Sequence, residues 1–132
     1  KEENDFIKSD DVICGSFTYG IKTSALKRVC AMKQTTDTEM MWVYFTDTGI
    51  FNVKRLENVD SRFVRDDIRM TMDYLEDLEF FIKIIESFDD TNYNLYDVVD
   101  LIDKNPDLKK INFHRHQEWS QNQKSKTKLV VK

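Results

Sequence analysis

Residues 68–88 read IRMTMDYLEDLEFFIKIIESF, and the predicted fold is built outward from them. Ile68, Met70 and Met72 alternate with polar residues, which is the two-residue period of a β-strand. Apolar residues then recur at helical spacing, at Leu75, Leu78, Ile82 and Ile85, with Phe81, Ile84 and Phe88 widening the apolar face. The segment therefore predicts a buried strand followed at once by a helix whose buried face carries Leu78, Ile82 and Ile85.

The junction between this strand and this helix is acidic. Asp73 and Glu76 have the spacing of a helix capping box. Asp77 is predicted to be a solvated acid in the first helical turn, and Arg69 is predicted to be exposed. Ligands of open α/β sheets bind beyond the carboxyl ends of strands. Asp73 is therefore a candidate for chemistry as well as a candidate helix cap.

Length and composition bound the class of protein. A chain of 132 residues is one domain or a piece of a larger one, and its first residue, Lys1, leads us to expect that a natural beginning is missing. The net charge of -4 predicts no general attraction to nucleic acid or to anionic lipid. No apolar run approaches the roughly 20 residues that span a bilayer. We therefore expect a cytoplasmic protein without a nucleic-acid or membrane partner.

The small numbers of cysteines and glycines exclude a disulfide scaffold and a glycine-rich phosphate loop within these residues. Cys14 and Cys30 are too few for a disulfide scaffold and lack metal-ligand spacing, so both are predicted to be reduced thiols. The chain has only three glycines, which excludes a glycine-rich phosphate loop within these residues.

The first half of the chain predicts further elements. A strand kinked at Gly15 is expected over residues 12–21, and a helix over residues 23–32 with Leu26, Val29 and Cys30 inward. Residues 35–47 fit either a helix, which the spacing of Thr36 and Glu39 favours, or a buried strand. Residues 50–56 alternate like a strand.

The second half predicts a helix over residues 95–104, capped by Asn94 and ended by Asn105-Pro106. Its buried face is predicted to carry Val98, Val99 and Ile102. Residues 117–132 are expected to form a polar tail. The order of elements predicts an α/β fold, a partial mixed sheet backed by helices.

The segment 69–79, RMTMDYLEDLE, resembles the carboxyl-terminal half of the cytidylyltransferase-like family. This family includes acylneuraminate and 3-deoxy-manno-octulosonate cytidylyltransferases, and the resemblance is nearest to its spore-coat polysaccharide branch. The family's strand ends in Asp and is followed by Thr-Pro-Glu-Asp-Leu and a helix. Asp73, Glu76, Asp77 and Leu78 match that pattern, whereas Tyr74 and Leu75 replace Thr and Pro. The similarity extends over about residues 12–116.

The resemblance implies the second half of a nucleotide-diphospho-sugar transferase fold and a function. The chain would belong to a protein that activates a sugar or sugar acid with CTP for surface-polysaccharide synthesis. Asp73 would help to hold a magnesium ion, and Glu39 would contact the substrate. Because the family's nucleotide loop and its other metal-binding Asp are absent here, this chain is not expected to be active alone.

Other interpretations of these residues stay open. Asp73 can be a helix cap alone, and Glu39 can be only a capping-box partner. His114 and His116 are a weak metal signal, for which an exposed polar helix is the preferred interpretation. The resemblance also implies a homodimer formed through residues 35–50, with Trp42 or Tyr44 at the interface. The alternative function is a non-catalytic interaction module that pairs through residues 40–45.

Overall fold

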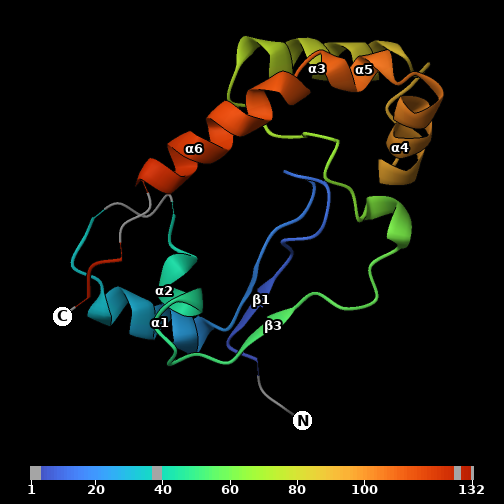
Figure 1. Ribbon diagram of the computed structural model, residues 1–132. Helices are drawn as coiled ribbons and strands as arrows, with labels where there is room; N and C mark the ends of the chain where they lie inside the picture. Colours follow the sequence, from blue (N-terminus) through green and yellow to red (C-terminus); the bar gives the residue numbers. More distant parts are fainter. Residues whose placement is uncertain (1–3, 37–39, 127–128, 132) are drawn as a thin grey trace. The chain divides into compact units, whose positions relative to one another are not determined.

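The structure is a computed structural model that describes residues 4–36, 40–126 and 129–131. It has the mixed α/β architecture that the sequence predicts, with a three-stranded sheet and several helices (Figure 1). The chain divides into two compact units. The first unit contains the described residues of 1–10, 18–57 and 120–132, and the second contains residues 11–17 and 58–119.

The first unit is built on a small mixed sheet in the order β2-β1-β3. The central strand β1 (Phe6–Lys8) pairs antiparallel with β2 (Gly20–Ile21) and parallel with β3 (Val53–Arg55). Phe6 lies opposite both Ile21 and Val53 and is buried, so this strand begins in the core of the unit. The sequence predicts no strand at residues 6–8, because the polar residues around them hide so short an apolar segment.

Two helices accompany this sheet. Helix α1 (Thr23–Met32) has the bounds that were predicted, and it buries Ala25 and Val29, whereas Cys30 is exposed rather than inward. Helix α2 (Val43–Thr46) is much shorter than the helix predicted over residues 35–47. The core of the unit consists of seven buried residues, namely Phe6, Ala25, Val29, Val43, Tyr44, Phe45 and Phe51.

Burial of Tyr44 bears on the predicted homodimer. Tyr44 is 2% exposed, and its hydroxyl donates a hydrogen bond to the carbonyl oxygen of Val130 at 3.2 Å. The apolar run 40–45 was expected to need a second subunit because it is apolar on both sides. The chain itself covers Val43, Tyr44 and Phe45, which removes that reason. The homodimer stays a prediction, and within that run only partly exposed residues such as Trp42 are accessible to a partner.

The second unit is helical apart from one isolated bridge. Its elements are the 3-10 turn η1 (Ser61–Phe63), the helices α3 (Leu75–Glu86), α4 (Leu95–Lys104) and α5 (Asp107–Lys110), and the turn η2 (Phe113–Arg115). Helix α5 packs against both α3 and α4. Helix α6 (His116–Lys126) begins in this unit and ends in the first, in the region predicted to be a polar tail. The core consists of Ile13, Phe63, Ile68, Phe80, Ile84, Val98, Val99 and Ile102.

The structure confirms the helix predicted over residues 95–104, which is α4. Asn94 caps it by accepting hydrogen bonds from the amides of Tyr96 and Asp97, and the helix ends at Lys104, before Asn105-Pro106. The predicted inward residues Val98, Val99 and Ile102 are all buried. A single apolar stripe was enough to identify the buried face.

Helix α3 has the predicted position but the opposite orientation. The residues predicted to be buried are exposed: Leu78 by 45%, Ile82 by 42% and Ile85 by 52%. Phe80 and Asp77 are buried, and so is Ile84, which was predicted to widen the apolar face. The helix is apolar on two sides, and the phenylalanine side faces the core.

The prediction of a strand directly before α3 is wrong. Over residues 68–72 the structure has one parallel bridge, between Cys14 and Arg69, and no named strand. The strand predicted over residues 12–21 is likewise reduced to Gly20–Ile21 and this bridge. Gly15 has φ +87°, and a Cβ atom there would lie 2.3 Å from the carbonyl oxygen of Met70. The two segments therefore approach each other too closely for a side chain at position 15.

No helix in the described part of the chain is both long enough and apolar enough to cross a membrane.

Candidate functional site

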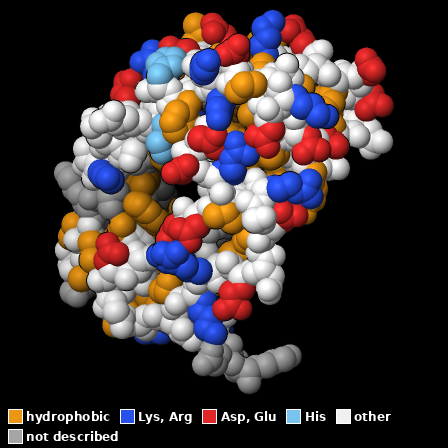
Figure 2. All heavy atoms as spheres, turned by 45° about the vertical axis from the view of Figure 1, so that its right-hand side comes forward, with side chains coloured by type: hydrophobic (Ala, Val, Ile, Leu, Met, Phe, Trp, Pro, Cys, Tyr) orange, Lys and Arg blue, Asp and Glu red, His pale blue; other side chains and the backbone are white. Residues whose placement is uncertain are grey.

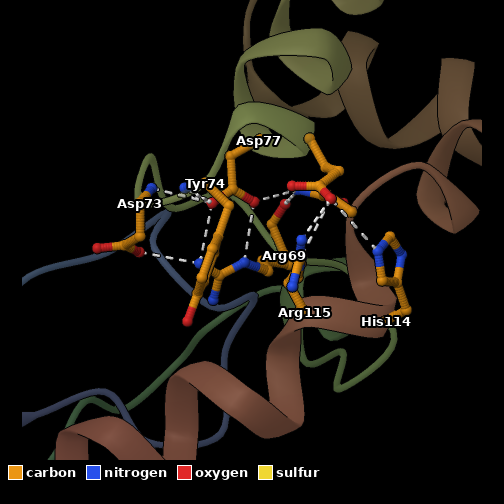
Figure 3. A network of polar contacts seen from close by, with 8 residues as sticks. Arg69, Asp73, Tyr74, Asp77, His114 and Arg115 are labelled. Atoms are coloured by element: carbon orange, nitrogen blue, oxygen red, sulfur yellow. Dashed lines mark hydrogen bonds and ion pairs between the residues drawn. The ribbon is translucent and has the colours of Figure 1, made fainter.

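The start of α3 carries a network of polar side chains around Arg69 (Figure 3). The guanidinium of Arg69 donates two hydrogen bonds to Asp77, from Nε to Oδ1 at 2.9 Å and from Nη2 to Oδ2 at 3.0 Å. Nη2 also donates to Oδ2 of Asp73 at 2.9 Å. Arg69 and Asp77 are both fully buried, so the predictions of an exposed Arg69 and a solvated Asp77 are wrong.

Asp77 is the acceptor at the centre of this network. Besides Arg69, it accepts from the side-chain amide of Asn112 at 2.9 Å and from the backbone amides of Asp73 and Tyr74 at 2.9 and 3.0 Å. Burial raises the pKa of the Asp77 carboxyl, but these hydrogen bonds, led by those from Arg69, outweigh burial and hold the pKa below its usual value. Asp77 is therefore ionised at neutral pH despite its burial.

These contacts also replace the predicted helix cap. Tyr74, not Asp73, is the N-cap residue, and its backbone amide is capped by Asp77 three residues later. The capping pattern is therefore shifted by one residue from the predicted pair of Asp73 and Glu76. Glu76 binds Arg115 instead, through Nη2 at 2.7 Å and Nε at 3.1 Å.

Aromatic rings complete the surroundings of the buried guanidinium. The Cζ atom of Arg69 lies 5.2 Å from the ring centroid of Trp119 and 5.4 Å from that of Tyr74. Cations at such distances from aromatic faces are attracted by the ring quadrupole. Nη1 of Arg69 is buried and has no hydrogen-bond partner among the described residues, so the two rings offset part of its lost hydration.

Asp73 is the accessible member of the network. Its side chain is 41% exposed, while Oδ2 is held by Arg69, which is itself fixed by Asp77. The carboxylate is thus oriented from the buried side and reachable from solvent. Of the residues predicted for the site, the structure places Asp73 in this network, whereas Glu39 lies outside the described residues.

Magnesium binding can be tested against this geometry. Mg²⁺ commonly takes one or two carboxylates and completes its shell with water and phosphate oxygens. Asp73 fits as one such ligand, but the oxygens of neighbouring Asp77 are already occupied by Arg69 and Asn112. No group of three metal-binding side chains occurs within residues 4–36, 40–126 and 129–131. The magnesium ion stays a prediction, with Asp73 as its single candidate ligand in this part of the protein.

The two histidines contribute little to this site. Nε2 of His114 lies 3.8 Å from Oε1 of Glu76, and the His114 side chain is mostly exposed. His116 is partly buried and stacks on Phe113, with 5.4 Å between the ring centroids. Burial and the nearby charge of Arg69 lower the pKa of His116. His116 is therefore neutral at pH 7.

Sequence reasoning missed two residues of the network. Asn112 donates to both the carbonyl oxygen of Arg69 and the carboxylate of Asp77, and Arg115 binds Glu76 and Glu118. Both residues come from the polar segment after Pro106, where no local pattern distinguishes them. Asp77 carries a recognisable signal, because it stands at the third position of the helix. An acidic side chain at that position can accept a hydrogen bond from the backbone amide of the N-cap residue, here Tyr74.

The first unit has a separate cavity of about 420 Å³. Its lining combines aromatic rings with lysine and aspartate side chains, from Phe6, Lys8, Asp10, Tyr19, Trp42, Val43, Thr46, Asp47 and Lys124. Trp42, one of the two residues predicted as candidates for a dimer interface, therefore lines a cavity of its own chain.

Comparison with known proteins finds a distant relative. The chain is 27% identical over 123 residues to an uncharacterized protein, MJ1063, of Methanocaldococcus jannaschii. The match covers 89% of this chain and 49% of that protein, so the chain spans about half the length of the relative. No family model matches the chain, and no solved structure matches it.

Proposed function

We propose that the chain is the carboxyl-terminal part of a nucleotidyltransferase that activates a sugar or sugar acid with CTP. The observation that carries the proposal is the accessible carboxylate of Asp73, oriented by the buried pair of Arg69 and Asp77 at the start of α3. A nucleotidyltransferase that uses magnesium needs a fixed, solvent-facing carboxylate of this kind.

The reaction would join the sugar to CMP. A hydroxyl oxygen of the sugar forms a bond to the α-phosphorus of CTP, the bond from that phosphorus to the β-phosphate bridging oxygen breaks, and pyrophosphate leaves. The hydroxyl proton passes to solvent or to a base. A bound magnesium ion would supply positive charge beside the phosphates. This chain would contribute Asp73 as a ligand, Arg69 as the residue that orients it, and Asp77 as the anchor of Arg69.

The length of the relative supports the same proposal. The chain lacks a glycine-rich phosphate loop, so residues beyond these 132 would have to bind the nucleotide. The archaeal relative has about as much chain outside the match as within it, which is enough for such a region. Glu39 is retained as the proposed substrate contact, and a homodimer as the proposed assembly.

Nucleotide binding tests the proposal directly. The complete gene product would be titrated calorimetrically with CTP in the presence of magnesium, with ATP, GTP and UTP as matched controls. We expect CTP to bind at least about tenfold more tightly than the other three, a difference of about 1.4 kcal/mol. Absence of CTP binding by the folded protein would refute the proposed function and leave the non-catalytic interaction module as the alternative.

A further inference from the structure

One side of α3 is apolar and is not covered by the rest of the second unit. Four aliphatic residues on this side are exposed: Leu75 by 68%, Leu78 by 45%, Ile82 by 42% and Ile85 by 52%. We call these four residues the α3 ridge. Their spacings of three, four and three residues are those of the a and d positions of a helix that packs lengthwise against another surface.

Exposure of the ridge is costly in water. Burying a Leu or Ile side chain stabilises a fold, and an uncovered row of such side chains forgoes much of that stabilisation. The opposite side of α3 already supplies Phe80 and Ile84 to the core. The ridge is therefore a second apolar surface, which indicates that something covers it.

The edges of the ridge argue against a second copy of this chain. Glu79 and Glu86 are exposed. Each follows a d residue of the ridge, so both occupy e positions of the heptad and lie along the same edge of the ridge. In a symmetric antiparallel pair of helices the same edges of the two helices meet, so these glutamates would face their own copies. Like charges placed opposite each other oppose such a pair. The Lys83 ammonium, 3.1 Å from Glu86, offsets the charge of Glu86, so Glu79 carries most of this effect.

The size of the ridge argues against a separate partner protein. Stable interfaces between separate molecules use roughly 20–30 residues on each side. Four aliphatic side chains on one helix are far fewer. A covering segment that belongs to the same polypeptide needs no such area, because the covalent connection supplies a high effective concentration.

We propose that the α3 ridge packs against a further segment of the same polypeptide, corresponding to the half of the archaeal relative that lies outside the match. The ridge is then an internal packing surface of a larger domain, in which α3 is buried on two sides. This inference does not depend on the nucleotide, so it stands or falls separately from the proposed function.

A photo-crosslink identifies the occupant of the ridge. p-Benzoylphenylalanine would replace Ile82 in the complete gene product, and mass spectrometry would identify the peptide joined to it after irradiation. The matched control places the same group at Lys83, the next residue and exposed. We expect position 82, and not position 83, to crosslink to a peptide outside these 132 residues within a monomer. A crosslink to residues 1–132, in the same molecule or in a second copy, a crosslink to another protein, or no crosslink at position 82 would each overturn the proposal. A complete gene product no longer than this chain would do so as well.

A charge in the ridge gives a second readout. Ile82→Lys should lower the melting temperature of the complete gene product by roughly 5–10 °C, because a buried lysine loses its hydration without gaining a partner. The matched control, Glu79→Lys at the exposed edge, should shift it by less than about 2 °C. Equal shifts for the two variants would show that the ridge is not covered and would overturn the proposal.

Discussion

At the scale of single residues, the pair of Arg69 and Asp77 holds the start of α3 in place. Both side chains are fully buried, and three further donors satisfy the carboxylate. A buried ion pair of this kind is not strong evidence of net stability. Removal of Asp77, however, leaves the buried charge of Arg69 with the partly exposed Asp73 as its one remaining carboxylate among the described residues. The conformation at the start of α3 therefore depends on the presence of both side chains.

Removal of the Asp77 carboxylate tests this dependence. Asp77→Ala leaves Arg69 buried with Asp73 as its remaining carboxylate, and it should lower the free energy of unfolding by about 3–5 kcal/mol. Urea denaturation measures the loss. Glu79→Ala, on the exposed side of the same helix, is the control and should cost less than about 0.5 kcal/mol. A loss below about 1 kcal/mol for Asp77→Ala would contradict the role of the pair.

The pH dependence of stability follows from the same carboxyl. Because the pKa of Asp77 is lower in the folded state than in the unfolded state, its contribution to stability is complete above the unfolded pKa of about 3.9. The contribution is lost as pH falls through the lower, folded pKa. Urea denaturation between pH 7 and pH 3 should show stability falling below about pH 4, and falling less steeply in Asp77→Ala. Equal slopes in the two proteins would exclude Asp77 as a source of the acid sensitivity.

Gly15 offers a second test at this scale. Gly15 and Gly49 both have positive φ, +87° and +71°, but only Gly15 lies against neighbouring backbone. Gly49→Ala should cost about 1–2 kcal/mol from the left-handed conformation alone. Gly15→Ala should cost clearly more, because its Cβ would collide with the carbonyl of Met70. Thermal denaturation of the two variants gives the comparison, and equal losses would contradict the close approach of the two segments.

At the scale of elements, helices with one apolar stripe were predictable and the helix with two was not. The apolar residues of α4 lie on a single stripe, and the structure buries that stripe, with Val98, Val99 and Ile102. In α3 either Leu78, Ile82 and Ile85 or Phe80 and Ile84 could face inward, and periodicity cannot choose between them. The neighbours decide: Asp77 pairs with Arg69 on the phenylalanine side and turns that side inward.

Two adjacent isoleucines test the orientation of α3. Ile84 is 3% exposed and Ile85 is 52% exposed. In the 132-residue chain, Ile84→Ala should lower the free energy of unfolding by about 2–5 kcal/mol, because it opens a cavity in the core. Ile85→Ala should cost less than about 1 kcal/mol where the ridge is uncovered. Chemical denaturation would contradict this orientation if Ile85→Ala were the more damaging change.

At the scale of the whole molecule, the sequence allowed the α/β class to be predicted but only part of the site. Asp73 was identified because it precedes a clear helix, and the network that orients it was not. Asn112 lies 35 residues from Asp77 along the chain, and only the packing of the second unit brings them together. The short strand at Phe6–Lys8 depends in the same way on pairing with distant residues.

The distribution of charge is a further property at this scale. On the face drawn in Figure 2, acidic and basic side chains are interspersed over the surface. Several charged side chains of the described residues form ion pairs. In one cluster, Arg65 lies 2.7 Å from Asp67 and 2.9 Å from Asp103. Charges of opposite sign that lie this close together largely offset each other's field at longer range.

Replacement of Asp73 by Asn in the complete gene product tests the proposed function most directly. Asn can still accept the hydrogen bond from Arg69, so the melting temperature should stay within about 2 °C of the unmodified protein. The negative charge that magnesium requires is removed. We predict that the formation of CMP-sugar from CTP, measured as pyrophosphate release across a magnesium titration, falls at least 10- to 100-fold, with a raised magnesium requirement. Undiminished turnover at low magnesium in a folded Asp73→Asn protein would contradict the assignment of Asp73 and the function built on it.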